Sequence, residues 1–256
     1  MQDVRDTYPT GQNQQLLRPF GPTILKREIP DQVLEDLGAL FANNTGLKDH
    51  SLNLAGNMQK EFTIDQDALD EGAAHRFTTM LADGSGELYS ISKRIQWEAT
   101  ERIATEKHRE IVNGRLGAMQ LNCVIHQSWG NISVAGDWNP THSHSGAISG
   151  VGYVRLPDDI EDEWANEDHD PSAGMIQFTY GNPQDMQSHN VRFKPEVGAI
   201  YFFPAWLLHE VYPFRSAGER WSFSFNTSVT NLMSDTDLTD EDKIALIEHR
   251  EANAQG

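Results

Sequence analysis

The chain contains a single cysteine, Cys123, among its 256 residues. An internal disulfide is therefore impossible, and a zinc cage built from several cysteine thiolates is excluded as well. Basic residues are also scarce, with 20 Lys and Arg against 38 Asp and Glu and a formal net charge of −18. Because such a surface repels nucleic acids and anionic membranes, we do not expect either to be the main partner.

Long apolar runs are missing too. No stretch approaches the roughly 18 apolar residues of a membrane-spanning helix. The first residues, MQDVRDTYPTGQ, lack the basic and apolar segments of a secretion signal. These features predict a cytoplasmic protein. A hydrophobic content of 38% with 9% aromatic residues is still enough for a core, and the length suits one large domain.

The hydrophobic periodicity changes from helical to strand-like near residue 117. Apolar residues recur at intervals of three and four within 31–41 and again within 86–112, which predicts two helices. Beyond residue 117, apolar and polar residues alternate as in half-buried strands. Residues 43–64 are expected to form a loop. The predicted strands cover 119–129, 132–135, 149–156, 175–180, 191–193, 199–203 and 221–229.

Helices followed by short strands favour a mainly β protein with flanking helices, of the α+β class, in which the helices pack outside an antiparallel sandwich or barrel. We expect an N-terminal arm and helices over residues 1–116, a β core over 117–230 and a C-terminal helix over 231–256, all in one structural domain. The acidic insertion at 157–173 is interpreted as a solvated loop.

Two histidines, His142 and His144, stand where a proline-containing turn runs into the apolar segment 149–156. On a strand they would point to the same face, where two imidazoles can hold one metal ion. Alone they are equally compatible with polar residues at the mouth of a strand. A third histidine, His209, follows a strongly apolar strand, where few polar side chains are expected.

Arg220 comes eleven residues after His209 and opens another alternating segment. Arg220 and Ser222 share one face of this strand, while Trp221 and Phe223 share the other. An arginine and a serine that project together suit a carboxylate, because the guanidinium group can donate paired hydrogen bonds to its two oxygens. The alternative is an edge strand whose polar face is solvated.

Together these motifs resemble the 2-oxoglutarate- and Fe(II)-dependent oxygenases. The segments HSHSGAISGVGYV and FFPAWLLHEVYPFRSAGERWSFSFN look most like a bacterial and phage type with a His-x-His variant, a Phe-Pro-x-Trp-Leu-x-His block and a closing Arg-x-Ser-x-Ser-Phe-Asn. The resemblance covers residues 117–230. It implies a double-stranded β-helix, the jelly roll shared with cupins, and an enzyme whose cofactors are Fe(II) and 2-oxoglutarate.

By matched position, the resemblance implies that His142, His144 and His209 bind the metal. It also implies that Arg220 binds the far carboxylate of 2-oxoglutarate and that Ser222 assists.

Further pocket residues follow from the same resemblance. Asn131 stands eleven residues before His142, as does an Asn that contacts the co-substrate in the alkylation-repair branch of the superfamily. Tyr153, on the following strand, is a candidate for the same pocket. Trp138 and Trp206 flank the histidines in sequence and are candidates for its wall. For all three aromatic residues, ordinary packing is the alternative.

The pattern departs from the family at His144, since most members have Asp or Glu there. With three neutral imidazoles, bound Fe(II) keeps one more positive charge than in the usual site, where one ligand is a carboxylate. Three-histidine iron sites occur in cupin-type dioxygenases, and zinc also accepts such a ligand set. Asp137 is an alternative carboxylate ligand, although a turn-forming role in GDWNP is the simpler interpretation.

The resemblance implies a dioxygenase that uses O2, hydroxylates a substrate and releases succinate and CO2. Two alternatives stay open. One is a three-histidine metal dioxygenase that does not use 2-oxoglutarate, and the other is a non-catalytic jelly-roll binding protein. The acidic composition favours a small or neutral substrate over nucleic acid.

Overall fold

The structure of the protein is a computed structural model. The structure describes residues 7–9, 14–17, 21–50, 56, 58–65, 67–100, 114, 120–166, 172–186 and 188–231. The predicted C-terminal helix over 231–256 lies almost wholly outside these residues, as does the part of the predicted helix 86–112 beyond residue 100.

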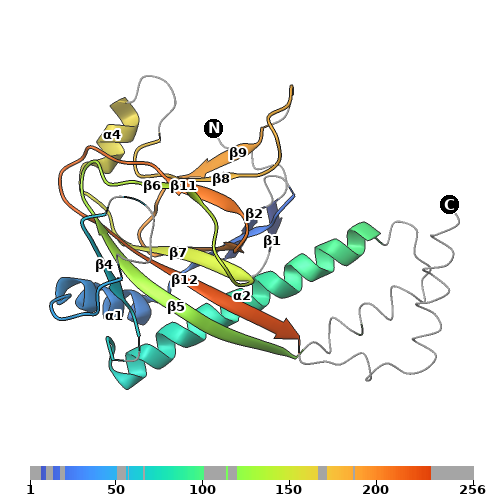
Figure 1. The fold of residues 1–256 in the computed structure, drawn as a ribbon, viewed down its shortest axis with the longest axis horizontal. Helices are drawn as coiled ribbons and strands as arrows, with labels where there is room; N and C mark the ends of the chain where they lie inside the picture. The colour runs from blue at the N-terminus through green and yellow to red at the C-terminus, as the bar shows by residue number, and fades with distance from the viewer. Residues whose placement is uncertain are drawn as a thin grey trace, which may run out of the picture.

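Two antiparallel sheets form the body of the protein (Figure 1). The strands of the larger sheet are β1 (Thr7–Pro9), β2 (Gln14–Leu17), β3 (Ile24–Glu28), β4 (Lys60–Thr63), β5 (Leu121–Ser133), β7 (Ile148–Arg155), β10 (Ala199–Pro204) and β12 (Arg220–Asn231). Those of the smaller sheet are β6 (Asn139–His142), β8 (Ile176–Thr179), β9 (Asn190–Phe193) and β11 (Leu208–Val211).

The strand order is that of a jelly roll. The larger sheet runs β1-β2-β3-β10-β7-β12-β5-β4 and the smaller one β6-β11-β8-β9. From β5 to β12 the chain passes back and forth between the two sheets, so that β5 pairs with β12 and β6 pairs with β11. The predicted fold class, mainly β with flanking helices in a double-stranded β-helix, is therefore confirmed.

Helices cover the outer face of the larger sheet (Figure 1). They are α1 (Asp31–Ala42) and α2 (Glu71–Thr100), while a short helix, α4 (Ile160–Asn166), lies within the predicted acidic loop. The main apolar core fills the space between these helices and the sheet, where Phe223 and Phe225 of β12 are fully buried. Within the described residues, no helix combines the length and the apolar character needed to cross a bilayer.

The helix predicted to begin at residue 86 begins at Glu71 instead. Gly84, which disfavours a helix on propensity alone, lies inside it. A side-chain carbon at Gly84 would stand 2.1 Å from the ring of Phe202, so the glycine lets the helix approach the sheet closely. Tertiary packing therefore overrides the local preference at this position.

The loop predicted over residues 43–64 contains β4, which the sequence reading missed. β4 pairs with β5, and Glu61 stands directly opposite Asn131 in the register. With only four residues, β4 is too short to show a clear alternating pattern.

A bulge in β5 exchanges the faces of this strand. His126 is an extra residue opposite the step from Asn226 to Thr227 in β12. As a result, Ile125 packs toward the helices. Trp129 instead faces the smaller sheet, where its ring lies against that of a histidine. The sequence spacing predicted one face for both residues, which is wrong.

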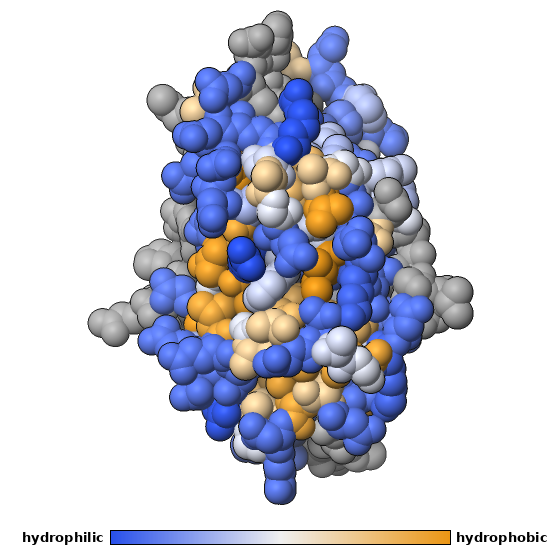
Figure 2. Space-filling view, turned by 90° about the vertical axis from the view of Figure 1, so that its left-hand side faces the viewer, coloured by the Kyte–Doolittle hydropathy of each residue, from blue (hydrophilic) through white to orange (hydrophobic). Residues whose placement is uncertain are grey.

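Apolar side chains also reach the surface. Figure 2 shows them gathered in the middle of the face at the end where α1 and α4 lie, with polar side chains around them. Over all faces of the described chain, the exposed large apolar residues are Val124, Trp138, Tyr180, Met186, Val197, Trp206 and Leu208.

Candidate metal centre and co-substrate pocket

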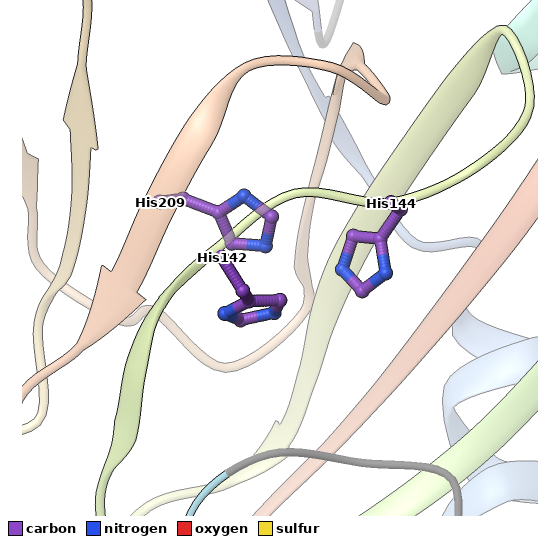
Figure 3. Close-up of side chains that lie close together, drawn as sticks. All are labelled: His142, His144 and His209. Atoms are coloured by element: carbon purple, nitrogen blue, oxygen red, sulfur yellow. The ribbon is translucent and has the colours of Figure 1, made fainter.

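Three histidines converge between the two sheets. One nitrogen from each of His142, His144 and His209 lies within 4.8 Å of the others. The ring centroids are 4.3 Å apart for His142 and His209, 4.9 Å for His142 and His144, and 5.0 Å for His144 and His209. Figure 3 shows the three rings grouped around one small space. Among the described residues this is the one group of three or more potential metal ligands.

The backbone places the histidines by two different means. His142 ends β6 and stands opposite His209 of β11 in the sheet register, so their side chains share a face. His144 lies beyond the end of β6, where its N–H donates to the carbonyl of Ala205 at 2.8 Å. Strand alternation was the reason given for His144 to join His142, and that reason is wrong, since a loop brings it there.

Hydrogen bonds orient two of the rings. Nδ1 of His142 lies 2.6 Å from the carbonyl oxygen of Pro140, and Nδ1 of His209 lies 2.9 Å from that of Leu207. A carbonyl oxygen only accepts, so each Nδ1 carries the proton and Nε2 keeps its lone pair. Such a tautomer is the one a metal ion requires from Nε2.

Burial keeps these imidazoles neutral. Burial, together with the neighbouring His142, lowers the pKa of His209 to about 3 and that of His144 to about 4. The pKa of His142 is lowered by burial as well. Without a proton to displace, all three rings are ready to bind a cation near neutral pH.

Arg220, at the start of β12, is a charged side chain in the protein interior. It is 1% exposed, and its guanidinium group donates to the carbonyl of Gly174 and to Oγ of Ser133, both at 3.1 Å. Its Nε has no hydrogen-bond partner, and no described carboxylate forms an ion pair with it. A buried guanidinium group with an open N–H has the chemistry to bind an anion.

Polar side chains continue from Arg220 across the inner face of the larger sheet, the face turned toward the histidines. Ser222 stands opposite Asn131 of β5 on one side and Tyr153 of β7 on the other. All three are buried, and the hydroxyl of Tyr153 has no partner within the described chain. Burial raises the pKa of Tyr153 to about 12, against the opposing effect of Arg220, so it stays a neutral donor.

The remaining predicted site residues lie elsewhere. Asp137 is outside the histidine group, because its Oδ2 accepts the backbone N–H groups of Gln59 at 2.6 Å and Val134 at 3.0 Å. It thus secures the turn before β6. Trp138 and Trp206 are half exposed, at 46% and 57%. They flank β6 and β11, the two strands that carry His142 and His209.

The sequence reading missed three inward-facing polar residues. Glu61 lies in the strand β4 that was not predicted, and neither His50 nor Asn226 was among the predicted site residues. Each is buried, and each has a side-chain atom that lacks a partner among the described residues. Burial without a partner is a three-dimensional property, and nothing in their sequence context signalled it.

In comparison with known proteins, residues 127–226 match a family model described as "Putative 2OG-Fe(II) oxygenase". No curated protein matches the chain. Among solved structures, a Pseudomonas putida prolyl-4-hydroxylase is similar with 14% identity and a TM-score of 0.46, covering 79% of this chain and 91% of its own.

Two further structures show a comparable likeness. A viral collagen prolyl hydroxylase from Paramecium bursaria Chlorella virus-1 has 13% identity and a TM-score of 0.44, with 80% of this chain and 94% of that one covered. HygX from Streptomyces hygroscopicus has 8% identity and a TM-score of 0.46, with 80% and 82% covered. These likenesses are too distant to indicate a substrate. The segment that matches this family model includes His142, His144, His209 and Arg220.

Proposed function

We propose that the protein hydroxylates a substrate while converting 2-oxoglutarate and O2 to succinate and CO2. In this proposal His142, His144 and His209 hold Fe(II) through three neutral nitrogen atoms. When bound, the iron supplies the activation of O2, with electrons from the oxidative decarboxylation of 2-oxoglutarate, so that one oxygen atom enters succinate and the other the substrate.

The observation that carries the proposal is the buried guanidinium group of Arg220. Leaving a charge unpaired in a protein interior is costly, and a dicarboxylate co-substrate would balance it. The hydroxyl groups of Ser222 and Tyr153 lie in register beside it and can donate to the same carboxylate. Their role is to fix the co-substrate in one orientation relative to the histidines.

Aromatic residues shield the histidines from water. The rings of Phe203 and Phe178 lie 4.8 Å and 6.0 Å from that of His209, and Trp129 lies 5.7 Å from His144. An apolar wall of this kind strengthens electrostatic interactions inside the pocket. On the open side, Trp138 and Trp206 are proposed to contact the substrate.

The missing carboxylate ligand suits an anionic co-substrate. Three imidazoles add no negative charge to the metal, and the one described cation at the pocket is Arg220. A doubly charged 2-oxoglutarate would therefore offset both the metal and the guanidinium group.

The test is to load the protein with Fe(II) and measure O2 uptake together with succinate formation, with and without 2-oxoglutarate. We expect succinate to form in step with O2 uptake. His209→Ala should weaken metal binding by more than about 100-fold, since it removes a ligand outright. His126→Ala is the matched control, because His126 lies outside the cluster and bonds Ser228 at 2.6 Å.

Two outcomes would replace the proposal. Metal-dependent O2 uptake that needs no 2-oxoglutarate would assign the chain to the three-histidine dioxygenases. An unchanged metal affinity in both His209→Ala and His142→Ala would favour a binding protein without this centre.

A further inference from the structure

The edge of the larger sheet carries two polar side chains, His50 and Glu61, that the proposed function does not use. A bridge between Asp49 and Phe62 places the segment at His50 antiparallel to β4, and the N–H of His50 donates to the carbonyl of Glu61 at 3.2 Å. His50 and Glu61 are thus cross-strand neighbours on one face. Glu61 in turn stands opposite Asn131, so this is the inner face.

Each side chain is buried yet incompletely bonded. His50 is 6% exposed and Glu61 7%, and neither Nε2 of His50 nor Oε1 of Glu61 has a hydrogen-bond partner in the described part of the chain. Nδ1 of His50 lies 3.3 Å from Oγ1 of Thr63. Native proteins seldom bury polar atoms without a partner, and each such atom calls for an occupant such as a ligand or a trapped water.

The surroundings of Glu61 are acidic. Burial, together with the negative charges of Asp49 and Asp137, raises the pKa of its carboxyl group to about 7. No described lysine or arginine forms an ion pair with Glu61. Burial lowers the pKa of His50, so the imidazole beside it is neutral and brings no positive charge. The negative charges of Asp49 and Asp137 near Glu61 therefore favour a cation over an anion at this place.

Trp129 connects His50 to the metal centre. The ring of His50 stacks on that of Trp129 with centroids 5.3 Å apart and an interplanar angle of 12°. Trp129 contacts His144 with centroids 5.7 Å apart. Arg220 belongs to β12, on the far side of β5 from β4, so the cationic and acidic ends of the inner face are separated by one strand.

We propose that Glu61 and His50 form the substrate subsite of this pocket and that they receive a positively charged nitrogen, an ammonium or guanidinium group. The inference rests on the proposed function, because it names the substrate class of the same site. Oε1 of Glu61 accepts one N–H of the cation and Nε2 of His50 accepts another. Arg220 at the opposite end prevents the anionic co-substrate and the cationic substrate from exchanging places.

The experiment uses protein loaded with Mn(II) and 2-oxoglutarate in the absence of O2. Three probes of equal length, n-butylammonium, n-butanol and butyrate, are titrated while ligand binding is followed by NMR. We expect n-butylammonium to bind about tenfold or more tightly than the other two. In Glu61→Gln this preference disappears, and in Glu61→Asp, which keeps the charge, part of it returns. Glu35→Gln, a change on the exposed face of α1, is the matched control and leaves it intact.

The outcomes separate this inference from the proposed function. Equal binding of the three probes, or a preference that survives Glu61→Gln, overturns the subsite. In that case a trapped water is the hydrogen-bond partner of Glu61. If the protein fails to bind 2-oxoglutarate but keeps a Glu61-dependent preference for n-butylammonium, the subsite stands and the proposed function fails. If the protein binds 2-oxoglutarate normally but shows no preference for n-butylammonium, the subsite fails and the proposed function stands.

Discussion

The two faces of β12 come from alternating residues of one strand, yet they differ in how far the protein completes them. On the outer face, Phe223 and Phe225 are fully buried against the helices and neighbouring strands. On the inner face, Arg220 and Asn226 are just as deeply buried but retain polar atoms without a partner among the described residues. The outer face is complete in the folded chain, whereas the inner face keeps polar atoms whose hydrogen-bonding capacity the described residues leave unused.

The packing of glycine against phenylalanine shows how closely the outer face is fitted. A side-chain carbon at Gly150 of β7 would stand 2.3 Å from the ring of Phe225, and one at Gly152 would stand 2.3 Å from that of Phe223. The rings occupy the space that these glycines leave. Arg220, by contrast, bonds a carbonyl and a hydroxyl group, and its Nε has no partner among the described residues.

The largest effect should come from the outer face. Phe223→Ala removes a ring that packs on Phe77 at 5.4 Å and leaves a cavity. We expect the free energy of unfolding to fall by about 3–5 kcal/mol, measured by urea denaturation. Ser224 is a half-buried residue on the inner face of the same strand. Ser224→Ala should lower the free energy of unfolding by less than about 1 kcal/mol. Equal losses of unfolding free energy in the two variants would contradict the difference between the two faces.

A smaller effect, on binding instead of stability, is expected at the inner face. Arg220→Met keeps the bulk of the side chain and removes the buried charge, so stability should be unchanged or slightly increased. The affinity for 2-oxoglutarate should fall about 100-fold, or roughly 3 kcal/mol, in calorimetric titrations of the metal-loaded protein. A large loss of stability with intact 2-oxoglutarate affinity would instead make Arg220 a structural residue.

The smallest effect should be a dependence of stability on pH. The carboxyl group of Glu61 has a pKa raised from 4.5 to about 7, so the folded state holds its proton more tightly than the unfolded state does. This contribution to stability is fully present below pH 4.5 and is lost as the pH rises through about 7.

Glu61→Gln should therefore be more stable than the original protein at pH 8, by about 2 kcal/mol, and similar to it at pH 4. Thermal unfolding at the two pH values measures the difference. A constant difference at both pH values would mean that Glu61 does not titrate in this range, and Glu35→Gln again serves as the exposed control.

Local patterns explain what was predictable. Alternation in β12 correctly separated Arg220 and Ser222 from Trp221 and Phe223, because the faces of a strand are set by neighbouring residues alone. Alternation failed in β5 and at His144, since a bulge and a chain turn interrupt the period and neither has a sharp sequence signature.

Other features depended on contacts between distant segments. α2 runs through Gly84 because Phe202 of β10 fills the space beside it, and that partner is more than a hundred residues away. β4 exists because it pairs with β5, and the same pairing sets Glu61 beside Asn131. In both cases the two partners are too far apart in the sequence for a local pattern to reveal their contact.

The sequence by itself determined the chemical groups of this protein and the face of each regular strand on which they stand, because side-chain identity and alternation are local. Only the tertiary structure decided which groups meet: His142 against His209, Arg220 beside Tyr153, and Glu61 with His50 at the edge of the pocket. The reason is that strand register and burial arise from pairing across the whole chain, and the loss of a hydrogen-bond partner appears only once water has been excluded.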